Sequence, residues 1–256
     1  MKYIIKKINI KTIDYAQYKD YFACASEERQ KKAMRYRREE DSIRCIMGEV
    51  LLKKALNEYG EAIGHYEIKS GKHGKPYLEP VRENIKKLYY NISHSGEWVY
   101  LILSDDEVGI DVEKITDKAT GIARRFFTEN ENRYIAHSEH PDEAFTRLWT
   151  IKEAYIKYLG TGLSKDLKSF EINITGDKVL ITDEGVTQNV LVKSTKKQEY
   201  FVAYVTYNYN NCMKETEGNE KEKNISISNI SNTDNVPDCV CADNHNNDLD
   251  GQGADA

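Results

Sequence analysis

A sharp change of composition near Asn210 decides how much of this chain can form a core. Beyond that point the sequence is dominated by Asn, Asp, Glu, Lys and Ser, with few large apolar residues. Such a segment cannot bury enough apolar surface to offset the entropy lost when it becomes ordered. We therefore expect residues 210–256 to be a disordered polar tail, and residues 1–209 to contain the folded structure.

Residues 1–209 alternate between strand-like and helix-like periodicity. In the first half, the pattern predicts strands at 3–10, 66–70, 88–92 and 99–104 and helical sequence over 26–59. In the second half, it predicts strands at 108–115, 169–174, 178–182, 190–193 and 201–207 and a helix over 142–159. Both halves are α+β and of similar size, which predicts two comparable lobes, residues 1–104 and 105–209, with a cleft between them.

Composition and charge limit the classes of function. The apolar fraction of 39% is enough for a core, and the net charge of -5 argues against a general nucleic-acid binder. No apolar run reaches transmembrane length, and the N-terminus lacks the apolar core and cleavage site of a secretory signal. The five cysteines are scattered. We therefore expect a cytoplasmic protein with reduced thiols, no disulfide framework and no membrane contact.

The segment 109–113 reads Gly-Ile-Asp-Val-Glu and has the alternation of a strand. This alternation puts Asp111 and Glu113 on one face, with Ile110 and Val112 on the other. Two carboxylates about 7 Å apart can share one hard cation. An edge strand with one solvated face would show the same pattern, so the residues alone leave both interpretations open.

A helical segment follows, in which apolar residues form one stripe around a single lysine. The stripe contains Phe145, Leu148, Trp149, Tyr155, Ile156 and Leu159. Lys152 lies in its middle, and a lysine directed into a core needs an anionic partner. Glu153 and Lys157, one turn apart, are also compatible with an ordinary surface pair. An acid between two cations beside an apolar wall favours a site for a magnesium-bound phosphate.

Three further segments are candidates for binding phosphate. The turn Gly71-Lys72-His73-Gly74-Lys75 lets the backbone approach a ligand while Lys75 supplies charge. Ser93 and His94 follow a predicted strand, where a hydroxyl and an imidazole can bind phosphate oxygens, although an ordinary turn has the same composition. Arg44 lies among apolar residues of the first helical segment, where its guanidinium needs an anion.

Taken in order, GKPY, NISHS, GIDVE, RFFTENE and LWTIKEAYIKYLGTGL resemble the surfactin-type family of 4'-phosphopantetheinyl transferases. The resemblance extends from about Lys31 to Phe170, and GIDVE followed by WTIKEAYIK is the family's signature. It implies a pseudo-twofold pair of α+β lobes in one chain. It also implies that coenzyme A and magnesium bind in the cleft between the lobes.

The resemblance further implies a role for each matching residue. Asp111, Glu113 and Glu153 would bind Mg²⁺, and Lys152 and Lys157 would hold the pyrophosphate. The residues around the phosphates and adenosine of coenzyme A would be Lys31, Arg44, Lys75, Ser93 and His94. The catalytic set would be Glu153 as first choice of general base, Glu131 as second choice, and Lys157 as stabiliser of transition-state charge.

The implied reaction moves 4'-phosphopantetheine from coenzyme A to a serine of an apo carrier protein and releases adenosine 3',5'-bisphosphate. The carrier could be a peptidyl or acyl carrier of nonribosomal peptide, polyketide or fatty-acid biosynthesis. We expect a monomer, because two lobes in one chain already build the cleft. Phe126 and Phe127, beside Arg124 and Arg125, are candidates for carrier docking or for core packing.

Two other functions use part of the same residue set. A magnesium-dependent phosphoesterase would use the acids with water as nucleophile and would need no protein acceptor. A non-catalytic module that binds coenzyme A or a nucleotide would need the cations but not three converging carboxylates. Neither accounts for the whole ordered set of motifs.

Overall fold

A computed structural model describes residues 2–117 and 119–209. The proposed tail at 210–256 lies outside these residues. The helices of the first half are α1 (Tyr15–Ala23), α2 (Glu27–Ala33) and α3 (Glu39–Tyr59). Its strands are β1 (Tyr3–Asn9), β2 (Tyr66–Ser70), β3 (Pro76–Pro80), β4 (Leu88–Ser95) and β5 (Trp98–Ser104).

The second half has three helices and six strands within the described residues. The helices are α4 (Ala119–Phe126), α5 (Glu129–Ala136) and α6 (Pro141–Leu159). The strands are β6 (Val108–Lys114), β7 (Phe170–Thr175), β8 (Lys178–Asp183), β9 (Val186–Thr187), β10 (Val190–Lys197) and β11 (Tyr200–Tyr207). All of the strands and the long helix that the periodicity predicts are present, with ends that differ by a few residues.

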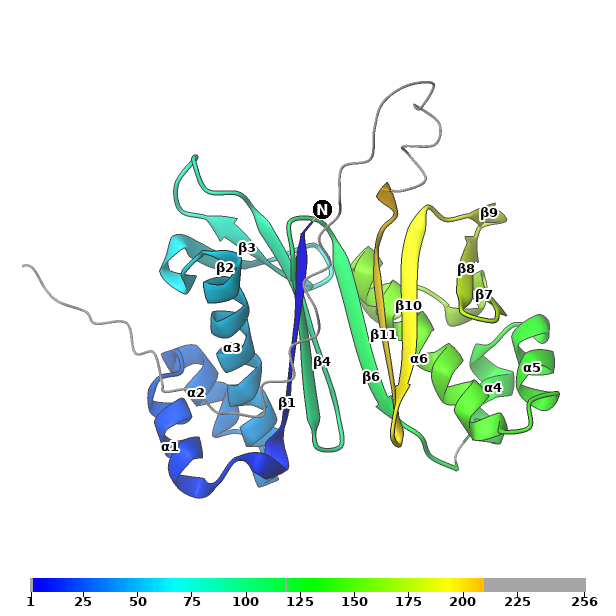
Figure 1. The fold of residues 1–256 in the computed structure, drawn as a ribbon, viewed down its shortest axis with the longest axis horizontal. Coiled ribbons are helices and arrows are strands. Elements are labelled where there is room, and N and C mark those ends of the chain that lie inside the picture. The colour runs from blue at the N-terminus through cyan, green and yellow to red at the C-terminus, as the bar shows by residue number, and fades with distance from the viewer. Residues whose placement is uncertain (1, 118, 210–256) are drawn as a thin grey trace, which may run out of the picture.

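The elements form four layers, with two sheets enclosed between two groups of helices (Figure 1). The first sheet has the antiparallel order β1-β5-β4-β3-β2, and the second has the order β10-β11-β6. A small sheet, β7-β8-β9, lies beside the second. Helices α1 to α3 cover the outer side of the first sheet, and α6 covers the outer side of the second (Figure 1). The division of the chain into lobes 1–104 and 105–209 stays a prediction.

Three clusters of buried side chains hold these layers together. One lies between α3 and the first sheet and includes Met47, Leu52 and Leu101. A second surrounds α6 and includes Tyr155 and Phe170. The third lies between the two sheets, where tyrosines and aliphatic residues of β5, β6 and β11 meet. The two halves therefore share an apolar interface, in addition to having a core each.

The prediction of one helical run over 26–59 is wrong, because the chain breaks between α2 and α3. α2 ends at Ala33, with Met34 as its C-cap, and α3 starts with three acidic residues that favour a helix N-terminus. The break lets α2 fold back against α3, where Ala33 is buried. α3 and α6 end at Gly60 and Gly160, whose positive φ angles of 94° and 67° suit glycine.

Within the described residues, Cys45 is a free thiol. The expectation that the thiols are reduced stays a prediction.

Candidate active site

The site is built where β6 of the second half runs alongside β4 of the first half. β6 is an edge strand of its sheet, so its outward N–H groups need partners outside that sheet. Side chains of β4 supply them at every second position. The hydrogen bonds run from Ile110 N to Asn91 Oδ1 (3.0 Å), from Val112 N to Ser93 Oγ (3.4 Å) and from Lys114 N to Ser95 Oγ (3.1 Å). The alternating polar residues of NISHS thus fix the register between the halves.

This register brings Asp111 of β6 against Lys157 of α6. The Asp111 side chain is buried, and its Oδ1 accepts hydrogen bonds from Lys157 Nζ at 2.7 Å and Ser93 Oγ at 2.7 Å. Lys157 Nζ also donates to Ser93 Oγ at 3.0 Å, which closes a triangle of three polar groups. The second oxygen, Asp111 Oδ2, is buried without a hydrogen-bond partner. A buried acceptor without a hydrogen bond destabilises the fold unless a ligand binds to it.

Two more acids lie near Asp111. Burial, and then the charge of Asp111, raise the pKa of Glu113 to about 7 from 4.5 and also raise the pKa of Glu153. Glu113 accepts a hydrogen bond from Ser95 Oγ at 3.1 Å. Among the described residues, Glu153 has neither a hydrogen bond nor an ion pair. A cation bound beside these acids would favour the charged forms of Glu113 and Glu153.

The donor chemistry of this cluster suits Mg²⁺, which prefers carboxylate and hydroxyl oxygens. The unpartnered Asp111 Oδ2 and the mutual repulsion of the acids agree with that. The present side-chain arrangement is not a formed metal site, since residues 2–117 and 119–209 contain no group of three His, Cys, Asp or Glu placed to hold a metal ion. The Lys157 ammonium instead supplies the positive charge beside Asp111.

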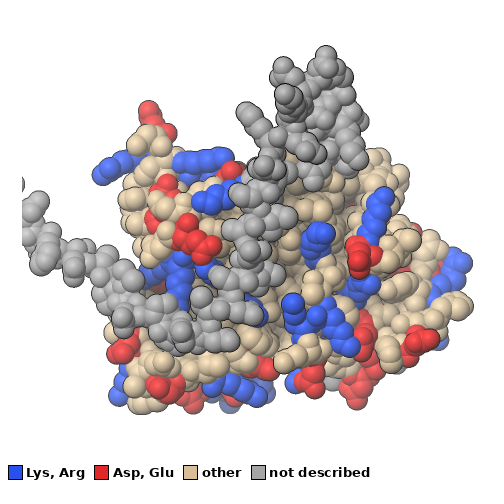
Figure 2. Space-filling model, in the orientation of Figure 1, with Lys and Arg blue, Asp and Glu red and all other residues tan. Residues whose placement is uncertain are grey.

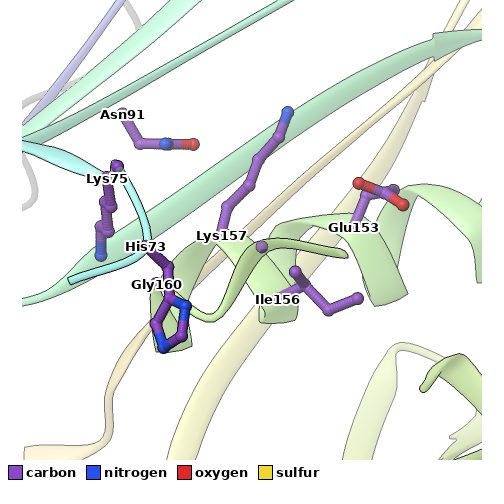
Figure 3. Close-up of a pocket in the computed structure, with 9 residues that line it drawn as sticks. His73, Lys75, Asn91, Glu153, Ile156, Lys157 and Gly160 are labelled. Atoms are coloured by element: carbon purple, nitrogen blue, oxygen red, sulfur yellow. The ribbon is translucent and has the colours of Figure 1, made fainter. Parts of the chain in front are cut away.

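A cavity of about 250 Å³ opens over this cluster (Figure 3). Its wall includes His73, Lys75 and Asn91 from the first half and Glu153, Lys157 and Gly160 from the second half. In Figure 3, Glu153 and Lys157 project from α6 into the same region, on the side facing Asn91. The cavity therefore lies between residues of both halves of the chain.

Lys75 ties the glycine-rich turn to the end of α6. Its Nζ donates to the Glu107 carboxylate and, at 2.9 Å, to the carbonyl of Tyr158. Burial lowers the pKa of Lys75, although the Glu107 carboxylate opposes this effect. The lysine lines the cavity wall and is paired with a carboxylate, and its predicted contact with a phosphate stays a prediction.

A larger cavity of about 480 Å³ adjoins the first and shares Gly74 and Asn91 with it. Arg44 and His94 line its wall. Arg44 donates to Asp41 and to the carbonyl of Gly96, and its Nε is buried without a partner. Burial, together with the charges of Arg44 and Lys157, lowers the pKa of His94. A neutral imidazole and a guanidinium with a free donor face this space.

The cations that α2 contributes to this cavity differ from the one that the sequence suggested. Lys31 does not line the cavity, because it lies on the exposed face of α2, where it pairs with Glu27 at 2.5 Å. Arg29 and Lys32 line it instead. Positions 29 and 32 are three apart and share a helix face, a spacing that could have identified them.

The predictions that Lys152 binds the pyrophosphate and that Glu131 is a second candidate for general base are wrong. Both side chains are 0% exposed and form an ion pair of 2.8 Å in the core of the second half. Lys152 Nζ also donates to the carbonyls of Leu167 and Phe170, both at 2.7 Å. Glu131 Oε1 accepts from Ile172 N at 2.8 Å. The ammonium and the carboxylate neutralise each other, and neither side chain lines either of the two cavities.

The aromatic pair near α4 has a packing role. Phe127 is buried and contacts Phe145 and Trp149, so it cannot take part in docking. Phe126 is half-buried and contacts Trp149 edge to face.

Comparison with known proteins decides the family. The model of the 4'-phosphopantetheinyl transferase superfamily matches residues 107–205, and a model of a 4'-phosphopantetheinyl transferase N-terminal region matches residues 13–105. The 4'-phosphopantetheinyl transferase gsp of Aneurinibacillus migulanus is 35% identical over 179 residues, which is 68% of each protein. The chain belongs to the 4'-phosphopantetheinyl transferase superfamily.

Two further proteins are similar to parts of this chain. The transferase Sfp of Bacillus subtilis is 30% identical over 160 residues, covering 61% of this chain and 70% of that protein. A solved holo-[acyl-carrier-protein] synthase of Thermotoga maritima is 27% identical, with a TM-score of 0.35, over 39% of this chain and 61% of that one. The two family models and the transferase gsp confirm the resemblance inferred from the motifs, and the helices and strands of the structure confirm the α+β class. Within the described residues, no helix is long and apolar enough to cross a membrane.

Proposed function

We propose that this protein transfers 4'-phosphopantetheine from coenzyme A to a serine of an apo carrier protein and releases adenosine 3',5'-bisphosphate. The observation that carries the proposal is the Asp111–Lys157 pair, with two further acids beside it, where two cation-lined cavities join. A ligand with a pyrophosphate and another phosphate needs cations at several points along its length. This chain presents them from Arg29 to Lys157, and its superfamily carries this activity in its name.

The phosphates of coenzyme A would contact the cations and the imidazole of the two cavities. These residues are Arg29, Lys32, Arg44, Lys75, His94 and Lys157. Asp111, Glu113 and Glu153 would hold Mg²⁺, with the Ser93 hydroxyl beside them. Magnesium bound there would neutralise charge on the pyrophosphate.

Glu153 is the proposed general base. It faces the first cavity, and within the described residues no hydrogen bond or ion pair occupies its carboxylate. Burial raises its pKa, which strengthens it as a proton acceptor. The carrier serine oxygen would bond to the phosphorus that bears pantetheine and lose its proton to Glu153. The phosphoanhydride bond would break, and adenosine 3',5'-bisphosphate would leave with the bonding electrons.

Lys157 would stabilise the charge that builds on the phosphate oxygens in this step. Its Nζ contacts Asp111 and Ser93, and its side chain lines the cavity that Glu153 also faces. A preorganised ammonium of this kind lowers the barrier, because charge develops next to it rather than in water.

Coenzyme A and a carrier protein are thus the proposed partners of a monomeric, cytoplasmic enzyme. On the described residues of the face in Figure 2, Lys and Arg side chains are interspersed with Asp and Glu. The net charge is -5. This distribution supports the absence of nucleic acid among the partners.

The decisive assay follows adenosine 3',5'-bisphosphate by chromatography. We expect it to form only when coenzyme A, magnesium and an apo carrier are all present, in a one-to-one ratio with modified carrier. Formation without carrier would favour a phosphoesterase. Bound coenzyme A that yields no product with either acyl or peptidyl carriers would favour a binding module.

A further inference from the structure

A carboxylate lies in the wall of the larger cavity, where an anionic ligand is proposed to bind. Glu49 of α3 lines this cavity, and its residue is 4% exposed. A negative charge so close to a polyphosphate would weaken binding if the charge acted only on the ligand. The contacts of Glu49 give it another role.

Both oxygens of Glu49 are bound to the first turn of α2. Oε1 accepts from Ser26 N at 2.8 Å, and Oε2 accepts from Ser26 Oγ at 2.7 Å. Lys53 Nζ lies 3.0 Å from Oε1. Burial would raise the pKa of Glu49, but hydrogen bonds from Ser26 and Lys53 outweigh it and hold the pKa below its usual value. The carboxylate is therefore charged, and both of its oxygens accept hydrogen bonds from protein groups.

Through Ser26, Glu49 controls where Arg29 points. Ser26 is the N-cap of α2, and its Oγ accepts from Arg29 N at 3.4 Å. Arg29 Nε also lies 3.7 Å from Glu49 Oε2. The same carboxylate thus fixes the start of the helix and one edge of the guanidinium. Lys32, three residues later on α2, lines the same cavity and moves with the helix.

We infer that Glu49 is a positioning residue, which holds the first turn of α2 so that Arg29 and Lys32 face the phosphates of the ligand. The inference rests on the proposed function, because it takes coenzyme A as the occupant of the cavity. A positioning role and a purely electrostatic role of Glu49 predict opposite changes in the affinity for coenzyme A. Removing this negative charge from an anion site weakens binding, whereas direct electrostatics alone would strengthen it.

The test measures coenzyme A binding by isothermal titration calorimetry for wild type, Glu49→Gln, Arg29→Met and the double variant. We expect Glu49→Gln to weaken binding about tenfold and to leave turnover at saturating coenzyme A unchanged, because Glu49 does not touch the reacting groups. In the Arg29→Met background, the same change should cost much less, since its effect passes through Arg29.

Glu58→Gln is the matched control. Glu58 lies on the same helix and pairs with Lys6 away from the cavity, so this variant should bind coenzyme A like wild type. Ser26→Ala is the milder second variant, which removes the hydroxyl and keeps both the Glu49 charge and the backbone N–H bond. It should weaken binding by a smaller factor, and near-ultraviolet circular dichroism should show both cavity variants folded.

Unchanged or tighter binding by Glu49→Gln would overturn the inference. So would losses that multiply in the double variant, because Glu49 would then act independently of Arg29. Absence of coenzyme A binding by the wild type would instead contradict the proposed function, so the two failures are distinguishable.

Discussion

Replacing Lys152 by methionine should strongly destabilise the fold while leaving the ligand site intact. The substitution keeps an apolar stem of similar length and removes the ammonium. It leaves the Glu131 carboxylate, 0% exposed, without its counter-ion, and it takes a donor from the carbonyls of Leu167 and Phe170. Breaking a buried pair in this way costs about 3–5 kcal/mol. Glu131 would keep its bond from Ile172 N, which places the expected loss toward the lower figure.

Urea unfolding followed by circular dichroism measures this loss. It is a large part of the roughly 5–15 kcal/mol that stabilises a typical domain. The control is Lys196→Met, which breaks an exposed pair with Glu143 and should cost less than about 1 kcal/mol. In the double variant Lys152→Met/Glu131→Leu, much of the stability should return, because no unpaired charge remains buried.

A contrary result is easily recognised. If Lys152→Met were as stable as wild type and bound coenzyme A many times more weakly, the ammonium would contact the ligand in solution. The buried pair would then not represent the working enzyme.

Three further predictions concern the site and the helix that carries it. Gly109→Ala should lower the melting temperature sharply, because its Cβ would lie 2.1 Å from the carbonyl oxygen of Ala154 on α6. Burial raises the pKa of Glu113 from 4.5 to about 7, so the folded protein keeps a proton that the unfolded chain has released. Stability should therefore fall as pH rises across that interval, and urea midpoints at several pH values should show a smaller fall in Glu113→Gln, in which Glu153 still has a raised pKa. Asp111→Ala should abolish magnesium-dependent transfer. Near-normal turnover in that variant would refute the proposed metal ligands.

Periodicity predicts α6 and most of the strands, because one face of each of these elements is apolar and buried. It misses the short strands β3 and β9 and the short helices α1, α4 and α5. It does not predict the break between α2 and α3. Polar residues on both sides of Met34 suit a continuous helix, and the sequence does not show the contact between Glu49 and Ser26 that holds α2 against α3. The choice between Lys31 and its neighbours depends on that geometry.

The position of Lys152 in its helix predicts only part of its role. Its place in an apolar stripe indicates an anionic partner, and the structure provides one in Glu131. The sequence cannot tell whether that anion is a ligand phosphate or a carboxylate of another helix. The shared orientation of Asp111 and Glu113 can be predicted from the sequence, because strand alternation alone puts both side chains on one face.

The register of the site is a similar case. The sequence predicts Ser93 and His94 of NISHS as phosphate ligands, and the structure adds that Asn91, Ser93 and Ser95 accept hydrogen bonds from β6. Their role depends on an edge strand that lies many residues away in the sequence. Only the assembled fold brings it beside them.

The central claim is tested most directly by the intact mass of a purified apo carrier protein after incubation with this enzyme, coenzyme A and magnesium, with and without a chelator. The account predicts that the carrier gains the mass of one phosphopantetheine group and that chelator prevents the gain. An unchanged mass for both peptidyl and acyl carriers, with coenzyme A bound to the enzyme, would contradict it.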